Sequence, residues 1–143
     1  MIVLDVNVLL ATFRADHPHH DIVRPWFDEA FVPGADIVIP DIVWVGFLRI
    51  VTNTHVFEVP STLAESFAFL EAVTGSSAYG TVPEPRRGWA DMREIATEAD
   101  ARGNLISDAY IAAVAMAHAA PVATMDRDFR RFTGLRILDP SAA

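Results

Sequence analysis

The chain has 143 residues, of which 52% are hydrophobic, and it carries a formal net charge of −8 at pH 7. This length and apolar content fit a single domain, residues 1–143, whose core is large enough to fold without covalent or metal cross-links. The absence of cysteine excludes a disulfide framework and a thiolate zinc site. Charged residues and proline interrupt the longest apolar run and no basic leader opens the sequence, so we expect a cytoplasmic protein without a membrane span.

The negative net charge argues against a broad basic surface that binds nucleic acid, since proteins that bind nucleic acid electrostatically usually present a basic face. All 11 basic residues are nevertheless arginine, whose planar guanidinium suits phosphate. Several are grouped, at Arg86 and Arg87 and again within 127–131. The alternative is that these arginines only balance nearby acids on solvated surfaces.

In the first half of the chain, short apolar runs alternate with segments of helical character. The predicted elements are a strand at 2–4, a helix at 6–15, a helix at 21–31, a strand at 37–39 and a helix at 41–53. The helix at 41–53 has a strand as its competing interpretation, because Val and Ile are frequent there. His17, His19 and His20 fall in the proline-containing break between the first two helices, where a solvated turn is favoured over a metal cluster.

The second half continues the alternation. The sequence Thr62-Leu63-Ala64-Glu65 fits a capping box that starts a helix ending at Gly75. Beyond it, the predicted elements are a short strand at 78–82, a helix from 89 to the Arg102-Gly103 break, a helix at 107–119 capped by Ser107, a strand at 121–124, a short helix at 126–132 and a strand at 135–138. Alternating strands and helices predict an α/β fold, with a central, mostly parallel sheet between helices.

Three aspartates far apart in the chain stand where apolar runs meet predicted helices. Asp5 and Asp126 follow predicted strands, and Asp108 falls near the start of a predicted helix. Ligands bind at the carboxyl ends of parallel strands, so we expect these acids to meet there. Three neighbouring carboxylates repel one another unless a cation joins them, which points to Mg²⁺ or Mn²⁺. Taken singly, each aspartate has the alternative role of a helix cap or turn residue.

Polar residues near these aspartates strengthen the interpretation that they form a metal site. Asn7 follows Asp5 by two positions, and Thr124 and Asp128 flank Asp126. These side chains supply hydrogen-bonding groups for water or for the ligands of an ion. Sequence alone does not identify RNA-contacting residues; Arg14, Arg49, Arg127 and Arg130 are candidates for the backbone of an RNA.

The segments that carry these residues resemble those of PIN-domain ribonucleases, and especially the VapC-type toxins of bacterial type II toxin–antitoxin modules. The resemblance extends over nearly the whole chain and rests on residues 2–10, 47–53, 104–113 and 123–129. It implies a single PIN domain that acts as an Mg²⁺- or Mn²⁺-dependent endoribonuclease, forms a homodimer and is inhibited by a cognate antitoxin.

The resemblance further implies that Asp5, Asp108 and Asp126 are catalytic, metal-ligating acids, with Asn7, Thr124 and Asp128 in supporting roles. The chain departs from the family at one place. Such toxins commonly carry a glutamate just before the Phe-Leu-Arg segment, where this chain has Gly46. Asp41 is a poor substitute, because it lies on a different side of the same predicted helix.

Two other functions stay open at this point. A PIN-like module whose site is weakened by Gly46 would bind RNA or protein without hydrolysis. A phosphatase is suggested by Asp5-Val6-Asn7, which resembles the nucleophile strand of haloacid-dehalogenase enzymes, but Asn7 lacks the acid that such chemistry requires. Neither the RNA that is cleaved nor the antitoxin can be read from the sequence.

Overall fold

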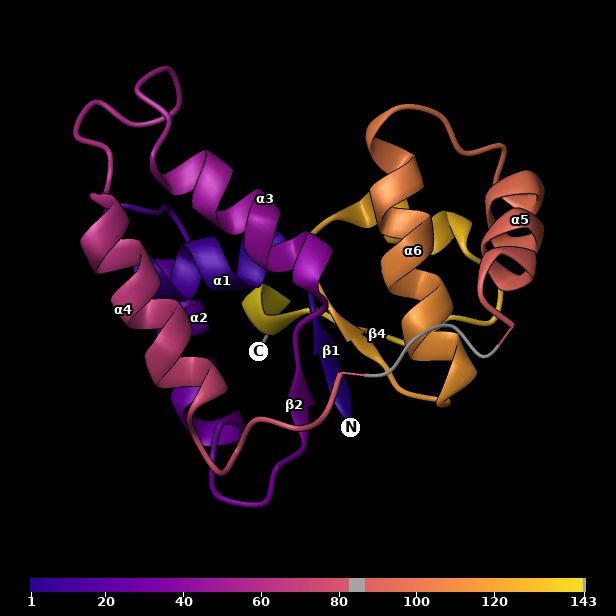
Figure 1. The fold of residues 1–143 in the computed structure, drawn as a ribbon, viewed down its shortest axis with the longest axis horizontal. Coiled ribbons are helices and arrows are strands. Elements are labelled where there is room, and N and C mark those ends of the chain that lie inside the picture. Colours follow the sequence, from indigo (N-terminus) through magenta and orange to yellow (C-terminus); the bar gives the residue numbers. More distant parts are fainter. Residues whose placement is uncertain (83–86, 143) are drawn as a thin grey trace.

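A computed structural model describes residues 1–82 and 87–142. In the described part of the chain, each strand is followed by one or more helical segments (Figure 1). In chain order the elements are β1 (Ile2–Leu4), α1 (Val6–Phe13), α2 (His20–Ala30), β2 (Ile37–Val38), α3 (Asp41–Val51), α4 (Leu63–Thr74), α5 (Trp89–Glu98), α6 (Asn104–Ala117), β3 (Val122–Ala123), the 3-10 helix η1 (Arg127–Arg131), β4 (Ile137–Leu138) and the 3-10 helix η2 (Pro140–Ala142).

The sheet has four strands in the order β2-β1-β3-β4, and every pairing is parallel. The first strand of the chain is therefore central: Val3 lies opposite Val38 of β2 on one side and opposite Val122 of β3 on the other. Val3, Val38 and Val122 are fully buried, as is typical of parallel strands covered on both faces. This arrangement confirms the predicted α/β class.

The sheet lies between two groups of helices (Figure 1). One group comprises α1 to α4, in which α1 packs against α2 and α3. The other comprises α6, which packs against β1 and β3, and α5, which packs on α6. Within the described part of the chain, no helix has both the length and the apolar character needed to cross a bilayer.

The segment after Pro40 is a helix, so the competing interpretation of a strand is wrong. Its buried side chains, Val43, Trp44, Phe47 and Val51, recur at helical spacing and face the core. The predicted capping box of α4 is also present: the Thr62 hydroxyl accepts from the Glu65 amide at 3.1 Å, and the Glu65 carboxylate accepts from the Thr62 amide.

Two predicted elements differ from the structure. The expected strand at 78–82 is reduced to a single parallel bridge between Tyr79 and Ile37. The helix expected to begin at Ser107 begins at Asn104 instead, after Gly103 with φ of +57°. Glycine tolerates this left-handed conformation readily, and it turns the chain into the helix one turn earlier than a serine cap would. Ser107 is therefore not a cap, and Asp108 lies beyond the first turn.

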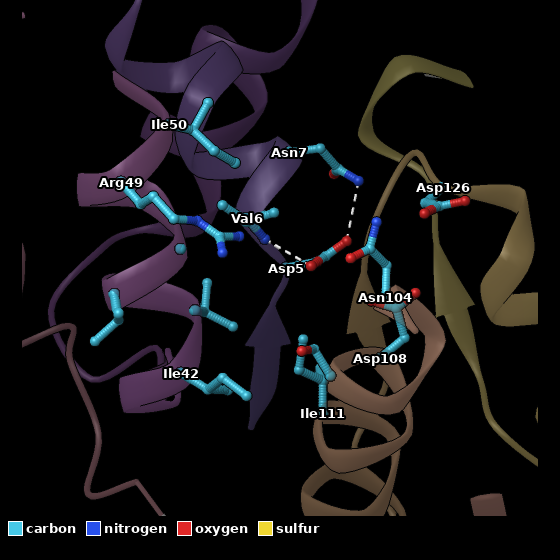
Figure 2. A pocket seen from close by; sticks show the side chains of 14 residues that line it. Asp5, Val6, Asn7, Ile42, Arg49, Ile50, Asn104, Asp108, Ile111 and Asp126 are labelled. Carbon is cyan, nitrogen blue, oxygen red and sulfur yellow. Dashed lines mark hydrogen bonds between the residues drawn. The ribbon is translucent and has the colours of Figure 1, made fainter. Parts of the chain in front are cut away.

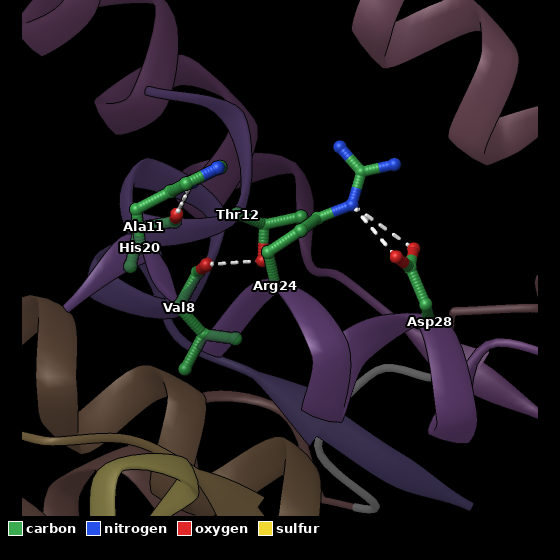
Figure 3. A network of polar contacts seen from close by, with 6 residues as sticks. All are labelled: Val8, Ala11, Thr12, His20, Arg24 and Asp28. Carbon is green, nitrogen blue, oxygen red and sulfur yellow. Dashed lines mark hydrogen bonds and ion pairs between the residues drawn. The ribbon is translucent and has the colours of Figure 1, made fainter. Parts of the chain in front are cut away.

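The histidine segment joins α1 to α2 through local contacts (Figure 3). Nδ1 of His20 lies 2.7 Å from the Ala11 carbonyl oxygen, which fixes the start of α2 against the end of α1. On the exposed side of α2, Arg24 forms an ion pair with Asp28 one turn later. His17 and His19 lie in the expected turn, whereas His20 is the first residue of α2.

Candidate active site

A cleft of about 420 Å³ opens between α3 and α6, at the carboxyl end of β1. Its lining comes from four parts of the chain, as Figure 2 shows. The lining residues are Asp5, Val6 and Asn7 after β1, Ile42, Val43, Val45, Gly46, Arg49 and Ile50 on α3, Asn104, Ser107, Asp108 and Ile111 on α6, and Asp126 after β3. One wall is thus mainly apolar, while the floor and the opposite wall are acidic.

Asp5 stands where β1 becomes α1 and is almost fully buried, with 3% of its surface exposed. One carboxylate oxygen, Oδ1, caps α1 by accepting from the Val6 amide at 2.7 Å. Oδ2 accepts from Asn7 Nδ2 at 3.0 Å and from the Thr124 hydroxyl at 2.8 Å. Burial raises the pKa of Asp5; the bonds from Thr124 and Val6 oppose this shift, and the charge of Asp126 adds to it.

Asn7 and Thr124 connect this carboxylate to the segment after β3. Asn7 Nδ2 donates to the Thr124 hydroxyl oxygen at 3.1 Å, and Asn7 Oδ1 accepts from the Met125 amide at 3.1 Å. The same Thr124 oxygen accepts from the Asp126 amide at 3.0 Å. The two side chains therefore fix the backbone on which Asp126 stands relative to Asp5.

Asp108 projects into the cleft from α6 (Figure 2). Partial burial raises its pKa to about 7, and the negative charges of Asp5, Asp126 and Asp128 contribute to the shift. The helix turn that separates Asp108 from Asn104 places both on the cleft side of α6. Asp108 follows the first turn of α6, so the partial positive charge at the N-terminus of the helix stabilises its carboxylate only weakly.

Asp126 is exposed at the mouth of the cleft and caps η1, since its Oδ1 accepts from the Asp128 amide at 2.9 Å. Asp128 is exposed and lies outside the cleft lining. Its influence is electrostatic, through the pKa of Asp108. The three predicted acids thus border one cleft, and Asp128 lies beside it.

The donor set fits a hard divalent cation. Carboxylate and amide oxygens from Asp5, Asp108, Asp126 and Asn104 border the cleft, and oxygen donors of this kind suit Mg²⁺ and Mn²⁺. Burial is the main cause of the raised pKa of Asp108, and the repulsion from Asp5, Asp126 and Asp128 that adds to it is one that a cation would relieve. Among the residues described, no three Asp, Glu, His or Cys side chains are already close enough together to share one ion.

Gly46 lines the cleft, and Asp41 does not. A Cβ built on Gly46 would meet only Val6 Cγ2, at 3.8 Å, so a longer side chain has room at this position. Sequence reasoning did not assign a role to Asn104, although its spacing of four residues from Asp108 places the two on one helix face.

The four candidate arginines differ in their surroundings. Arg49 lines the cleft, whereas Arg127 and Arg130 lie exposed on η1. Arg14 is occupied elsewhere: it pairs with Asp16, donates to the Ser61 hydroxyl and stacks on Phe57. Of the grouped pair at 86 and 87, position 86 lies outside the described residues, and Arg87 pairs with Asp91 and Glu94.

Comparison with known proteins places this geometry in a family. The profile of the PIN domain matches residues 2–135. The chain is 48% identical to "Ribonuclease VapC31" of Mycobacterium tuberculosis, over 98% of this chain and 99% of the relative. It is 45% identical to "Ribonuclease VapC25" of the same species, with the same coverage.

Solved structures share the fold. VapBC2 from Rickettsia felis, bound to a DNA fragment from its promoter, has a TM-score of 0.68 at 21% identity, over 96% of this chain and 98% of that chain. VapBC-1 from nontypeable Haemophilus influenzae has a TM-score of 0.68 at 19% identity, over 99% of both chains. The chain belongs to the PIN-domain family and, within it, to the VapC ribonucleases.

Proposed function

We propose that the cleft between α3 and α6 hydrolyses an RNA phosphodiester, with Mg²⁺ or Mn²⁺ held by Asp5, Asp108 and Asp126. The observation that carries the proposal is the meeting of these three aspartates, from distant segments, around one cleft. Membership of the VapC ribonucleases supports RNA as the substrate. When bound, such an ion activates water and neutralises phosphate charge.

The chain's own residues prepare this cleft in two ways. Thr124 and Asn7 hold the carboxylate of Asp5 in one orientation, which keeps one acid fixed before any ligand arrives. The apolar side chains of Ile42, Val45 and Ile50 form the opposite wall, which concentrates the carboxylates on one side of the cleft.

The test compares RNA cleavage by the wild type and by Asp108→Asn. This substitution is preferable to Asp5→Asn, because the Asp5 carboxylate accepts three hydrogen bonds that hold the site together. We expect the wild type to lose cleavage in EDTA and regain it with Mn²⁺, and Asp108→Asn to be inactive under both conditions. Full activity in EDTA, or in Asp108→Asn, would refute the proposed site.

The rival function, a PIN-like module that binds without hydrolysis, predicts RNA or protein binding with no metal-dependent cleavage. The same assay separates the two. Turnover of small phosphate esters by the wild type would instead favour a phosphatase.

The proposal includes a cognate antitoxin that neutralises the toxin in the cytoplasm. It is supported by the fold that the chain shares with FitAB and VapBC assemblies. The test is co-expression with a small open reading frame found next to the gene: we expect growth arrest by the toxin alone and a copurifying complex without arrest when both are made. Arrest that persists despite complex formation would contradict neutralisation.

The proposal also includes a homodimer. Helix α4 exposes Leu63 and Phe67, at 62% and 43%, one turn apart, and paired apolar groups of this kind favour association. Trp44 on α3, by contrast, is buried. We expect Leu63→Glu to convert a dimer into a monomer in light scattering, while Leu138→Glu, at another exposed apolar position, leaves it dimeric. A monomeric wild type would contradict this part of the proposal.

A further inference from the structure

Arg49 has a distinctive place in the cleft. Among the described residues that line it, Arg49 carries the only basic side chain, against three carboxylates. Figure 2 shows its guanidinium extending from α3 toward Val6 and Asp5, across the cleft from Asp108. A cation and a group of acids thus border the same space from opposite walls.

Arg49 has no acidic residue one helical turn before it in α3. Gly46 and Arg49 lie three positions apart in α3, so they are neighbours on the same helix surface. Gly46 offers no acid there. Within residues 1–82 and 87–142 Arg49 has no hydrogen bond or ion pair, whereas Arg14, Arg24 and Arg87 each pair with nearby acids.

A free guanidinium at this position is suited to one class of ligand. Its planar set of donors matches the oxygens of a phosphate, which it binds with two parallel hydrogen bonds. The Gly46 gap adds room beside Val6, where a Cβ would still be 3.8 Å from the nearest side-chain atom. The cleft therefore pairs an anion-binding wall with an acidic wall suited to a cation.

We propose that Arg49 binds a backbone phosphate of the RNA on the α3 wall of the cleft, and that Gly46 leaves it free to do so. This inference rests on the proposed ribonuclease function and assigns a residue to its substrate. It also gives Gly46 a positive role: an acid at this position would compete with the RNA for the guanidinium. The absence of a carboxylate from position 46 is then a property of substrate binding.

The first experiment measures, by fluorescence anisotropy, the binding of a fluorescein-labelled pool of single-stranded RNA of random sequence. The buffer contains Ca²⁺, the salt concentration is varied, and gels check that the RNA stays intact. We expect Arg49→Gln to weaken binding about tenfold and to lower the slope of log K against log salt by about 0.7, the value for one phosphate contact on a single strand. Arg49→Lys should keep the slope and lose part of the affinity. Arg93→Gln, at an exposed arginine of α5 outside the cleft, is the matched control and should change neither.

The second experiment tests the role of Gly46. Gly46→Glu places an acid within reach of Arg49 and should reduce RNA binding about tenfold, as Arg49→Gln does. Gly46→Gln adds almost the same volume without the charge and should lose much less RNA affinity than Gly46→Glu. Equal losses in both variants would show that space, rather than the freed guanidinium, matters at position 46, and would overturn this role.

The outcomes separate this inference from the proposed function. If the wild type cleaves RNA with Mn²⁺ but Arg49→Gln binds RNA with unchanged affinity and salt dependence, the inference fails and the function stands. If the wild type cleaves no RNA yet Arg49→Gln loses binding and slope, the Arg49 contact stands and hydrolysis fails. In an active enzyme, the Arg49→Gln defect should appear mainly in KM, because the phosphate contact is already made in the ground state.

Discussion

The hydroxyl of Thr124 donates a 2.8 Å hydrogen bond to the carboxylate of Asp5, although 119 positions separate them in the sequence. The parallel pairing of β1 with β3 brings the two strand ends together, with Leu4 opposite Ala123. The bond joins residues directly after those strands and so orients the acid at the base of the cleft. The site is therefore part of the core that holds the sheet together.

Thr124→Val should lower both stability and activity. The substitution keeps the shape of a buried side chain but removes the hydroxyl that contacts Asp5, Asn7 and the Asp126 amide. We expect a loss of about 2 kcal/mol in urea unfolding, because polar partners are left unsatisfied. Thr12→Val is the control, since the buried Thr12 hydroxyl bonds only within α1. Equal effects of the two substitutions would argue against a special role for the network.

The metal-free protein should become less stable as pH rises from about 4 to about 7. The pKa of Asp108 is raised from 3.8 to about 7 in the folded chain, so the folded state binds more protons than the unfolded state across this interval. Stability then falls with increasing pH, by about 1 kcal/mol once solvent screening of this partly exposed group is allowed for. Urea unfolding in EDTA at several pH values measures it.

Asp108→Asn is the matched comparison for that pH series. It removes the titrating group without adding charge, so the variant should show a smaller decline between pH 4 and 7 and greater metal-free stability than the wild type above pH 7. Parallel curves for the two proteins would show that another group is responsible.

Divalent metal should stabilise the wild type against heat. An ion that binds only the folded state at 100 times its dissociation constant contributes about 2.7 kcal/mol, so Mn²⁺ should raise Tm by several degrees. The increase should be smaller in Asp108→Asn. In Gly46→Glu it should be larger if position 46 lacks a metal ligand. An unchanged metal affinity in Gly46→Glu would argue against a missing metal ligand at position 46. An unchanged Tm of the wild type with Mn²⁺ would argue against metal binding.

Arg14→Ala should reduce stability without affecting RNA binding. The guanidinium lies 4.0 Å from the Phe57 ring centroid and donates to the Ser61 hydroxyl at 2.9 Å, which ties the loop before α4 to the end of α1. Losing these contacts should cost about 1 kcal/mol in thermal or urea unfolding. A large loss of RNA affinity with normal stability would instead place Arg14 among the RNA contacts.

Much of the architecture could be predicted because its signals are local. The apolar run that ends at Asp5 and the capping box at Thr62 each have a physical cause within a few residues. Comparison with relatives confirms the predicted PIN-domain fold and VapC-type ribonuclease class. The metal, the catalytic roles and the homodimer stay predictions.

The errors arose where tertiary context decides. Ser107 has the chemistry of a cap, but the left-handed backbone at Gly103 starts α6 earlier. Residues 78–82 suit a strand, yet only Tyr79 reaches the sheet edge at Ile37. That Arg49 forms no ion pair within the described residues could not be predicted from the sequence either, because ion pairing depends on which acids surround a side chain in space.

The central place of β1 makes the order of synthesis important. Asp5 is synthesised 119 positions before its partner Thr124, and β1 has no neighbour on that side until β3 exists. Pairings of such long sequence separation form late. The hydrogen bond that orients the Asp5 carboxylate is therefore among the last contacts that folding completes.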